Sequence, residues 1–240
     1  MDVREPVPQR KARGLALAGL LSFLAVWCVL SYTGLVPTVI LPSPTEVIRA
    51  FPVLHFEEAL VRSAGWSLYR VGMGFVLSAL VAIPLGLLMG TFPAVRHFLS
   101  PLVDPLRFLP ISALVPLFLV WFGIEETMKI MLLFVGIFVY LQTATTLGAS
   151  RWQLVRHVLV PGSLPAIGEA LRVMNGIGWT YVILAEIVNA RLGLGHIITV
   201  AGKRSHVDQI FAGVLVILFI GVVTDGMIRV ANKQLFAWKS

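Results

Sequence analysis

The chain has 240 residues, of which 58% are apolar and only 13% charged, and its net charge is +7. A soluble domain carries about 25% charged and 45–50% apolar residues, so this composition excludes an ordinary soluble fold and predicts an integral membrane protein. In a membrane protein, excess positive charge reports topology and contact with anionic lipid rather than nucleic-acid binding. The single cysteine, Cys28, lies in an apolar run, which excludes an intrachain disulfide and a thiolate metal cluster.

Six apolar runs follow one another along the chain, and each is predicted to be a membrane-spanning helix. The first, Gly14–Gly34, has 21 residues, enough to cross about 30 Å of hydrocarbon. Basic residues precede it, as in a signal peptide. However, it is too long for a signal sequence and no clear cleavage site follows, so we expect it to be retained. The other predicted spans are Ser63–Gly90, Leu106–Gly123, Thr127–Leu141, Ile167–Ala190 and Ile210–Val230.

The distribution of Lys and Arg predicts the orientation of these spans. Six spans place both termini on one side of the membrane. With the termini inside, the inner segments 1–13, 91–107, 142–165 and 229–240 hold 11 Lys and Arg residues, and the outer segments hold 6. The positive-inside rule therefore puts both termini in the cytoplasm. We expect a cytoplasmic tail over residues 1–13 and a single transmembrane domain over residues 14–240, with a cytoplasmic loop at about 142–165.

The fourth run is short for a membrane span. Its 15 residues, Thr127–Leu141, make roughly 22 Å of helix, below the ~30 Å required. Two explanations remain open: the helix continues through 142–147, or residues are absent at this point of the chain.

Small residues recur at every fourth position of the second run and predict close helix packing. They are Ser78, Ala82, Gly86 and Gly90. Such a stripe lets another helix approach closely, either within this chain or in a second subunit. Pro84 is expected to kink this helix and Pro93 to end it.

A short interfacial helix is predicted between the first two spans. Ser43 or Thr45 can cap it, because either side chain can accept from a backbone amide of the first turn. Its apolar face is expected to hold Val47, Ile48 and Phe51.

Residues 144–167 form a polar, basic, amphipathic stretch between apolar runs. Three apolar residues at spacings of three and four mark one face of a predicted helix: Trp152, Val155 and Leu159. Ser150 can cap this helix, Pro161 is expected to end it, and a turn at 162–163 leads to Pro165 in the first turn of the next helix. Composition alone leaves two readings open: a helix lying on anionic lipid, or a docking element for another protein.

The chain lacks the motifs of a catalytic or nucleotide-binding protein. No glycine-rich phosphate loop precedes Gly202-Lys203, and the five histidines have no metal-ligand spacing. No span carries the paired acidic residues of a proton relay. Residues 192–195, Leu-Gly-Leu-Gly, predict a tight turn at the membrane surface rather than a dinucleotide site.

The 142–161 segment resembles the "EAA" cytoplasmic loop of binding-protein-dependent ABC importer permeases. That pattern is Glu-Ala-Ala, three residues, Gly, nine residues, Ile, one residue, Leu-Pro. Here Gly148 matches the glycine, Val158 and Val160 stand for Ile and Leu, and Pro161 matches the proline, whereas 142–144 reads Gln-Thr-Ala. Further stretches are similar to the nitrate/taurine/alkanesulfonate branch: 41–44, 104–107, 121–124, 146–150, 185–186 and 193–195. Members of this branch carry a longer stretch before the glycine.

The resemblance implies a type I ABC importer permease fold, all-α, in the bacterial cytoplasmic (inner) membrane. It implies as partners a second permease copy in a homodimer, two ABC ATPase subunits, a periplasmic or lipid-anchored substrate-binding protein and membrane lipid, but no nucleic acid. ATP and Mg would act on the ATPases, leaving this chain without catalysis or cofactor. The implied solute is a small anion of the sulfonate, taurine, nitrate or bicarbonate type. The implied ATPase-coupling residues are Ala144, Leu147, Gly148, Ala149, Ser150, Arg151, Trp152, Arg156 and Pro161.

The fifth span is the first candidate for the lining of the path, because it is unusually polar. Its candidates are Asn175, Trp179, Thr180, Tyr181 and Glu186, and the third span adds Ser112. A carboxylate in the apolar interior costs about 2.5–3.5 kcal/mol, so Glu186 should face protein or water, paired with an Arg or with backbone amides. Arg172 is placed to pair with Glu169 at spacing three.

Two alternatives to an ABC permease remain. A secondary transporter would show an internal repeat and ion-coupling residues, and neither is found. A membrane-embedded enzyme would need a clustered catalytic set, and none is found in the sequence.

Overall fold

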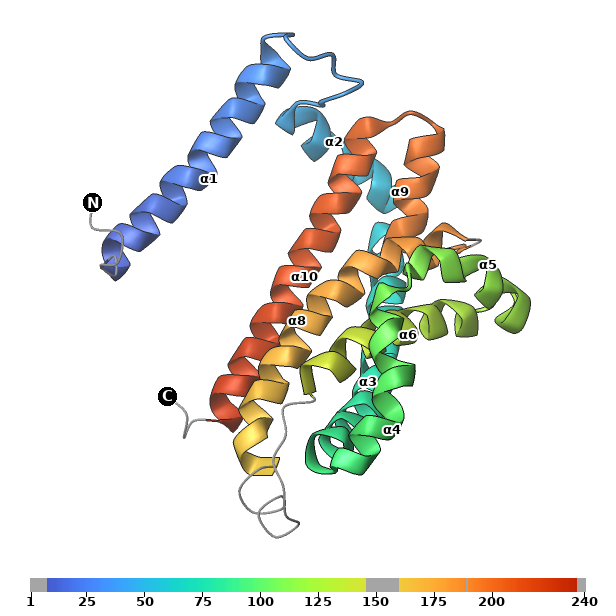
Figure 1. Ribbon diagram of the computed structural model, residues 1–240. Coiled ribbons are helices and arrows are strands. Elements are labelled where there is room, and N and C mark those ends of the chain that lie inside the picture. The colour runs from blue at the N-terminus through green and yellow to red at the C-terminus, as the bar shows by residue number, and fades with distance from the viewer. Residues whose placement is uncertain (1–7, 146–159, 189, 237–240) are drawn as a thin grey trace.

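The computed structural model describes residues 8–145, 160–188 and 190–236, and these form helices joined by loops, with no strand among them. The predicted all-α fold is therefore confirmed. In chain order the elements are α1 (Gln9–Tyr32), α2 (Pro44–Phe56), α3 (Leu60–Thr91), α4 (Pro93–Val103), the 3-10 helix η1 (Asp104–Phe108), α5 (Ile111–Phe122), α6 (Glu126–Thr145), α8 (Val160–Ile187), α9 (Leu194–Lys203) and α10 (Val207–Leu235) (Figure 1).

The body of the fold is a bundle in which α3 packs on α6, α6 on α8, and α8 on α10. The small-residue stripe of α3 lies in the first of these contacts, where Ser78, Ala82 and Gly86 are buried. A Cβ added at Gly74 would lie 2.7 Å from Cβ of Leu133 on α6, and the Ser78 hydroxyl donates to the Phe134 carbonyl at 2.8 Å. The stripe therefore serves close packing within the chain.

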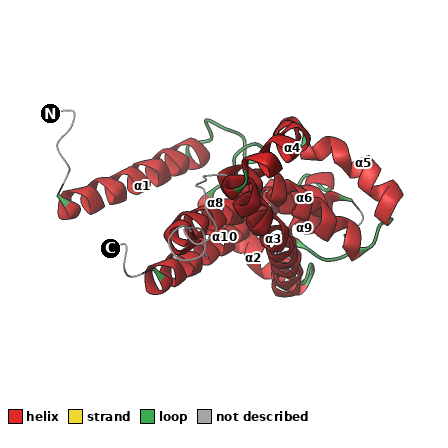
Figure 2. Ribbon diagram, turned by 60° about the horizontal axis from the view of Figure 1, so that its bottom comes forward, coloured by secondary structure: helices red, strands yellow, loops and turns green. Residues whose placement is uncertain are grey.

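Helix α1 stands apart from this bundle and is attached to it near one end (Figures 1 and 2). The Trp27 indole N–H donates to the Pro42 carbonyl at 2.9 Å, the Tyr32 hydroxyl bonds to Thr45 at 3.0 Å, and the Trp27 and Phe211 ring centroids are 6.1 Å apart. The start of α1 and the end of α10 lie toward the same side of the molecule (Figure 1), as an even number of crossings requires.

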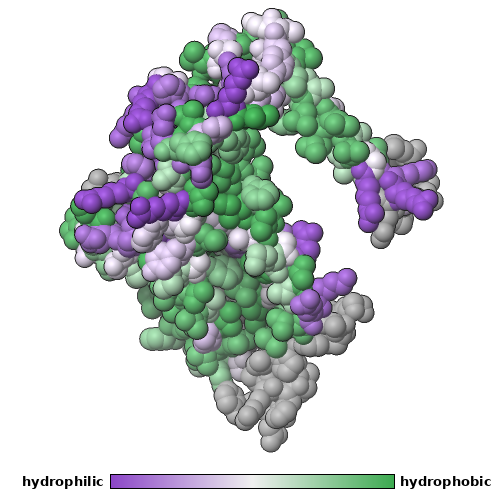
Figure 3. Space-filling model, turned by 180° about the vertical axis from the view of Figure 1, so that it is seen from behind, coloured by the Kyte–Doolittle hydropathy of each residue, from purple (hydrophilic) through white to green (hydrophobic). Residues whose placement is uncertain are grey.

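Three helices are long and apolar enough to cross a membrane: Arg10–Tyr32, Leu60–Thr91 and Val207–Leu235. A fourth candidate is the pair Pro93–Phe108 and Ile111–Phe122, which bends by 106°. The third predicted span, 106–123, is therefore not one continuous helix, because Pro110 separates η1 from a 12-residue α5 of about 18 Å. Hydrophobic residues cover much of α1 and the middle of the bundle, whereas hydrophilic ones gather toward the top of this face and at the start of α1 (Figure 3).

The fourth predicted span is completed by the residues that follow it. Helix α6 runs to Thr145, and its 20 residues make about 30 Å of helix, enough to cross the hydrocarbon layer. Of the two explanations for the short fourth run, the structure therefore supports a helix that continues past residue 141. Six crossings remain a prediction, with the 28-residue α8 as the fifth.

The predicted turn after Pro161 is wrong, because α8 begins at Val160 and contains residues 162–163 and Pro165. Pro161 is the second residue of this helix, where its missing N–H has no helical partner to lose. Pro165 removes one backbone hydrogen bond near the start of the helix and does not interrupt it. The described helices leave residues 146–159 between them, a shorter connection than the predicted 142–165.

The predicted interfacial helix is α2. Ser43 caps it in a capping box: its hydroxyl accepts from the Glu46 amide at 3.3 Å, and the Glu46 carboxylate accepts from the Ser43 amide at 2.7 Å. The buried face consists of Val47, Ala50 and Leu54. Ile48, expected on this face, is exposed, because the buried positions recur at spacings of three and four from Val47.

Candidate functional site

The segment predicted to couple this chain to an ATPase connects the ends of α6 and α8. Leu147, Gly148, Ala149, Ser150, Arg151, Trp152 and Arg156 lie outside the described residues. Ala144 is in the last turn of α6, and Pro161 is in the first turn of α8. These two helix ends lie toward the same side of the molecule as the end of α10 (Figure 1). Any force on residues 146–159 is therefore passed first to α6 and α8.

Polar contacts join α8 to α10 within the bundle. The Asn175 amide and the Trp179 indole both donate to the Thr224 hydroxyl, at 3.0 and 3.2 Å, and that hydroxyl is also within donating distance of two carbonyls of its own helix. Asn175 and Trp179 are almost fully buried. The structure thus gives two of the proposed path residues a role in helix–helix contact.

An ion-pair network joins the same two helices nearer the start of α8. Arg172 bonds to Asp225 at 2.7 Å, and Asp225 also accepts from Arg229 at 3.0 Å. The predicted pair between Arg172 and Glu169 is present at 3.2 Å. Asp225 was missed because it lies 53 residues away in the sequence, and no periodicity connects positions on different helices.

A buried charge cluster lies at the other end of α8. Glu186 and Arg70 are 0% and 1% exposed, and their carboxylate and guanidinium meet at 2.7 Å. The Arg70 guanidinium also donates two hydrogen bonds, of 2.6 and 2.8 Å, to the Glu126 carboxylate. The Lys129 ammonium donates to the same carboxylate at 2.9 Å. A bidentate Arg–carboxylate pair is among the stronger polar contacts in proteins. The cluster joins α3, α6 and α8 at a single point.

The cluster also fixes the loop that leads into α9. Arg70 donates to the Leu192 carbonyl at 2.7 Å, and the Glu186 carboxylate accepts from the Gly195 amide at 2.8 Å. Gly193 has φ +143°, a conformation that favours glycine, and a Cβ there would collide with the Glu186 carboxylate. The predicted partners of Glu186, an Arg and a backbone amide, are confirmed; the predicted turn over 192–195 is shorter, because the chain bends at 191–193 and α9 begins at Leu194.

The remaining path candidates differ in their surroundings. Ser112 on α5 and Thr180 on α8 are exposed, and Thr180 bonds to the carbonyl of Gly176 in its own helix. Tyr181 is half-buried, and its ring lies against Gly136 of α6. Arg70 was not selected from the sequence, although a lone arginine inside a long apolar run is a signal that could have identified it.

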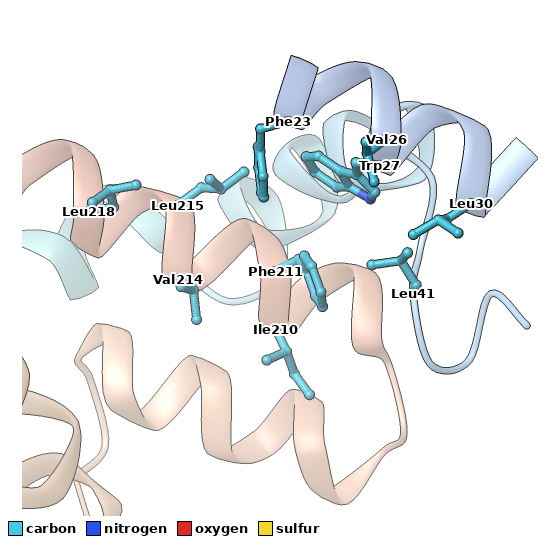
Figure 4. Close-up of a pocket in the computed structure, with 10 residues that line it drawn as sticks. All are labelled: Phe23, Val26, Trp27, Leu30, Leu41, Ile210, Phe211, Val214, Leu215 and Leu218. Atoms are coloured by element: carbon cyan, nitrogen blue, oxygen red, sulfur yellow. The ribbon is translucent and has the colours of Figure 1, made fainter. Parts of the chain in front are cut away.

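An apolar cleft of about 610 Å³ separates α1 from α10 (Figure 4). Its walls are Phe23, Val26, Trp27, Leu30, Leu41, Ile210, Phe211, Val214, Leu215 and Leu218. No polar side chain contributes to it apart from the indole of Trp27, which is bonded to the Pro42 carbonyl. The cleft therefore suits an apolar occupant.

Comparison with known proteins places this architecture in a transport family. Residues 140–236 match the family described as binding-protein-dependent transport system inner membrane component. The chain is 31% identical to the taurine transport system permease protein of Escherichia coli, over 93% of this chain and 89% of that protein. It is 29% identical to the bicarbonate transport system permease protein of Synechococcus elongatus, over 88% and 85%.

The alignment with the Escherichia coli protein also measures a length difference. It extends over 245 residues, whereas 93% of this 240-residue chain is about 223 residues, so about 22 aligned positions have no counterpart here. The family match includes the 146–159 segment, and the relatives align along nearly the whole chain. The chain therefore belongs to the binding-protein-dependent inner-membrane permeases of ABC importers, in the nitrate, taurine and sulfonate group.

Proposed function

We propose that two copies of this chain form the membrane path of an ATP-driven importer for a small anionic solute. The relatives' names support the solute class, since taurine carries a sulfonate and bicarbonate is itself an oxyanion. ATP and Mg would bind to two separate ATPase subunits, and a binding protein would deliver the solute from outside. The termini and residues 146–159 would face the cytoplasm of a bacterial inner membrane, in keeping with the bias of Lys and Arg.

The observation that carries this proposal is the placement of α8. Its 28 residues make about 42 Å of helix, with the predicted coupling segment at one end and the Arg70–Glu186 cluster at the other. Arg172, Asn175 and Trp179 hold it to α10 along the way. A helix held along its length in this way is expected to move as one rigid body. Displacement of the coupling segment by an ATPase would therefore be felt at the far end of the bundle.

The apolar cleft supports the proposed homodimer. Apolar side chains all around α1 are exposed, and the attachments of this helix to the body lie near its Tyr32 end. Because α1 is attached at one end only, the apolar cleft lies open between α1 and α10. We propose that a helix of the second copy fills this cleft. Val214→Trp, which fills the cleft, should lower the dimer fraction in native-mass measurements, and Val76→Trp on α3 is the matched control. An unchanged dimer that loses bound lipid would assign the cleft to lipid.

Gly148→Asp tests the coupling role directly. Gly148 is the glycine of the motif, and a charged side chain there should displace the ATPase while the permease still inserts. We expect ATP-driven uptake into proteoliposomes to fall at least tenfold. Gly202→Asp, the same change at an exposed position on α9, should leave uptake intact. Unchanged uptake in Gly148→Asp would refute the docking role.

The secondary-transporter alternative makes the opposite prediction. In that case the chain alone would move solute in proteoliposomes without any ATPase subunit. Uptake that requires both ATP and an active ATPase partner excludes it, and uptake by the chain alone would refute the importer proposal. Among the path candidates, Ser112 and Thr180 are the exposed ones and are proposed to line the route.

A further inference from the structure

A cavity of about 390 Å³ opens beside the buried charge cluster. Helix α3, the start of α6 and the loop before α9 form its walls. Its polar lining consists of Trp66, Arg70, Glu125, Glu126, Lys129 and Arg191. Arg70 lies ten residues into α3, about 15 Å from the start of that helix, whereas the other walls are the start of α6 and the loop after α8.

Several donors in this cavity lack an acceptor among the described residues. Lys129 is only 3% exposed, yet its ammonium group, which has three N–H donors, makes a single bond, to Glu126. Arg70 uses four hydrogen bonds, one fewer than its five N–H groups allow. The indole N–H of Trp66 has no acceptor in the part of the chain described here. Trp66 is half-buried, whereas the spare N–H groups of Lys129 and Arg70 belong to buried side chains and cost free energy, so this cavity favours a ligand that supplies acceptors.

The carboxylates of the cluster are, by contrast, already occupied. Glu186 accepts from Ser67, Arg70 and the Gly195 amide. Glu126 accepts two bonds from Arg70 and one from Lys129. Arg191 adds an exposed positive charge at the rim, and Glu125 adds an exposed negative one. Exposed charges are screened by water, whereas the buried ammonium of Lys129 is not. The positive and negative side chains of the cluster balance, so the unmet demand is for oxygen acceptors for the spare N–H groups, not for a cation.

We propose that this cavity binds a small oxyanion, with Lys129, Trp66 and Arg191 as its donors. The proposal deepens the proposed function and rests on it for the identity of the ligand as solute, but binding itself is measurable without transport. Oxyanion binding would draw Lys129 away from Glu126, which is 39% exposed and keeps its two bonds to Arg70. The cavity would then be a solute-binding site at the end of α8 opposite the coupling segment.

Titration of the assembled transporter in lipid nanodiscs, without binding protein, tests this site. Sodium methanesulfonate, bicarbonate and nitrate are the probes, sodium chloride is the control for charge alone, and binding is read by calorimetry. We expect saturable binding of at least one oxyanion and at least tenfold weaker binding in Lys129→Met. Lys203→Met, an exposed cation on α9 outside the cavity, is the matched control and should bind as the natural chain does. Arg191→Met, at an exposed position, supplies a second test that does not depend on the folding of Lys129→Met.

The outcomes separate this site from the proposed function. Equal oxyanion affinity in Lys129→Met, Arg191→Met and the natural chain would overturn the site, as would chloride binding as tightly as the oxyanions. ATP-driven uptake that persists in that case leaves the importer proposal standing. Lysine-dependent oxyanion binding in a complex that shows no ATP-driven uptake would instead support the site and refute the importer proposal.

Discussion

Replacing Arg70 with Met should destabilise this protein more than any other single loss of charge in the described residues. Met has an unbranched apolar side chain that replaces the aliphatic part of Arg70. The substitution removes all four hydrogen bonds of the guanidinium, which are 2.6–2.8 Å long. Glu126 is partly exposed and can be solvated by water. Glu186 is 0% exposed, so its carboxylate would keep only Ser67 and the Gly195 amide as partners, and no cation.

The expected cost follows from this uncompensated charge. Removing one partner of a buried ion pair costs about 3–5 kcal/mol, because the remaining charge stays in a medium of low dielectric constant. Neutralising that charge in the same background, with Arg70→Met combined with Glu186→Gln, should recover at least about 1.4 kcal/mol, a factor of ten in the unfolding equilibrium. Arg172→Met, which removes a half-exposed arginine, should cost less than about 1 kcal/mol.

Reversible unfolding in mixed detergent micelles, followed by far-ultraviolet circular dichroism, measures these differences. The reasoning requires Arg70→Met to be the least stable of the single variants and the double variant to be more stable than Arg70→Met. A loss below about 1 kcal/mol in Arg70→Met would contradict it. A double variant as unstable as Arg70→Met would also contradict it, because the loss of stability would then not arise from the unpaired carboxylate of Glu186.

Three further predictions concern helix packing and capping. Gly74→Val should cost about 1–3 kcal/mol in micelle unfolding, because its side chain has no room against α6, whereas Gly72→Ala, with no atom near its added Cβ, should be tolerated. Thr224→Val should cost about 1–3 kcal/mol in the same assay, because two buried donors of α8 lose their acceptor. The backbone amide of Ser43 lowers the pKa of Glu46, so the capping box should be fully formed above the ordinary glutamate pKa and be lost as the pH falls through the lower folded value. The protection factor of the Glu46 amide, which compares its exchange with that of an unstructured amide at the same pH, should fall over that acidic range and should also fall in Ser43→Ala at neutral pH; protection independent of both would refute the capping argument.

Much of the fold could be predicted from the sequence because apolar run length and capping chemistry act locally. The capping residue of α2, the small-residue stripe of α3 and the turn at Gly193 were all predicted from neighbouring residues. The errors lie where proline decides the outcome: Pro110 shortens α5, whereas Pro161 and Pro165 fall within the first two turns of α8 and do not end it. Whether a proline breaks a helix depends on how far it lies from the start of that helix. The sequence pattern did not determine where α5 and α8 begin.

The site was less predictable, because its contacts join residues far apart in the chain. Glu186 was expected to have a cationic partner, but the partner is Arg70, 116 residues earlier. Asn175 and Trp179 were selected for their polarity in a span, and the structure pairs both with Thr224. Polarity therefore identified positions that need a partner, but it did not distinguish a helix contact from a solute contact. The residues of the coupling motif were selected by resemblance and stay a prediction.

The sequence distance between Arg70 and its partners has a consequence for synthesis. Glu126 follows Arg70 by 56 residues and Glu186 follows it by 116. At about 5–20 residues per second, Arg70 emerges about 3–11 s before its first carboxylate and about 6–23 s before its second. An unpaired arginine inside the membrane costs about 2.5–3.5 kcal/mol on insertion scales. We therefore expect α3 to be inserted incompletely until α6 has been made, and the end of the bundle that holds the charge cluster to pack only when the last residues of α8 have been made.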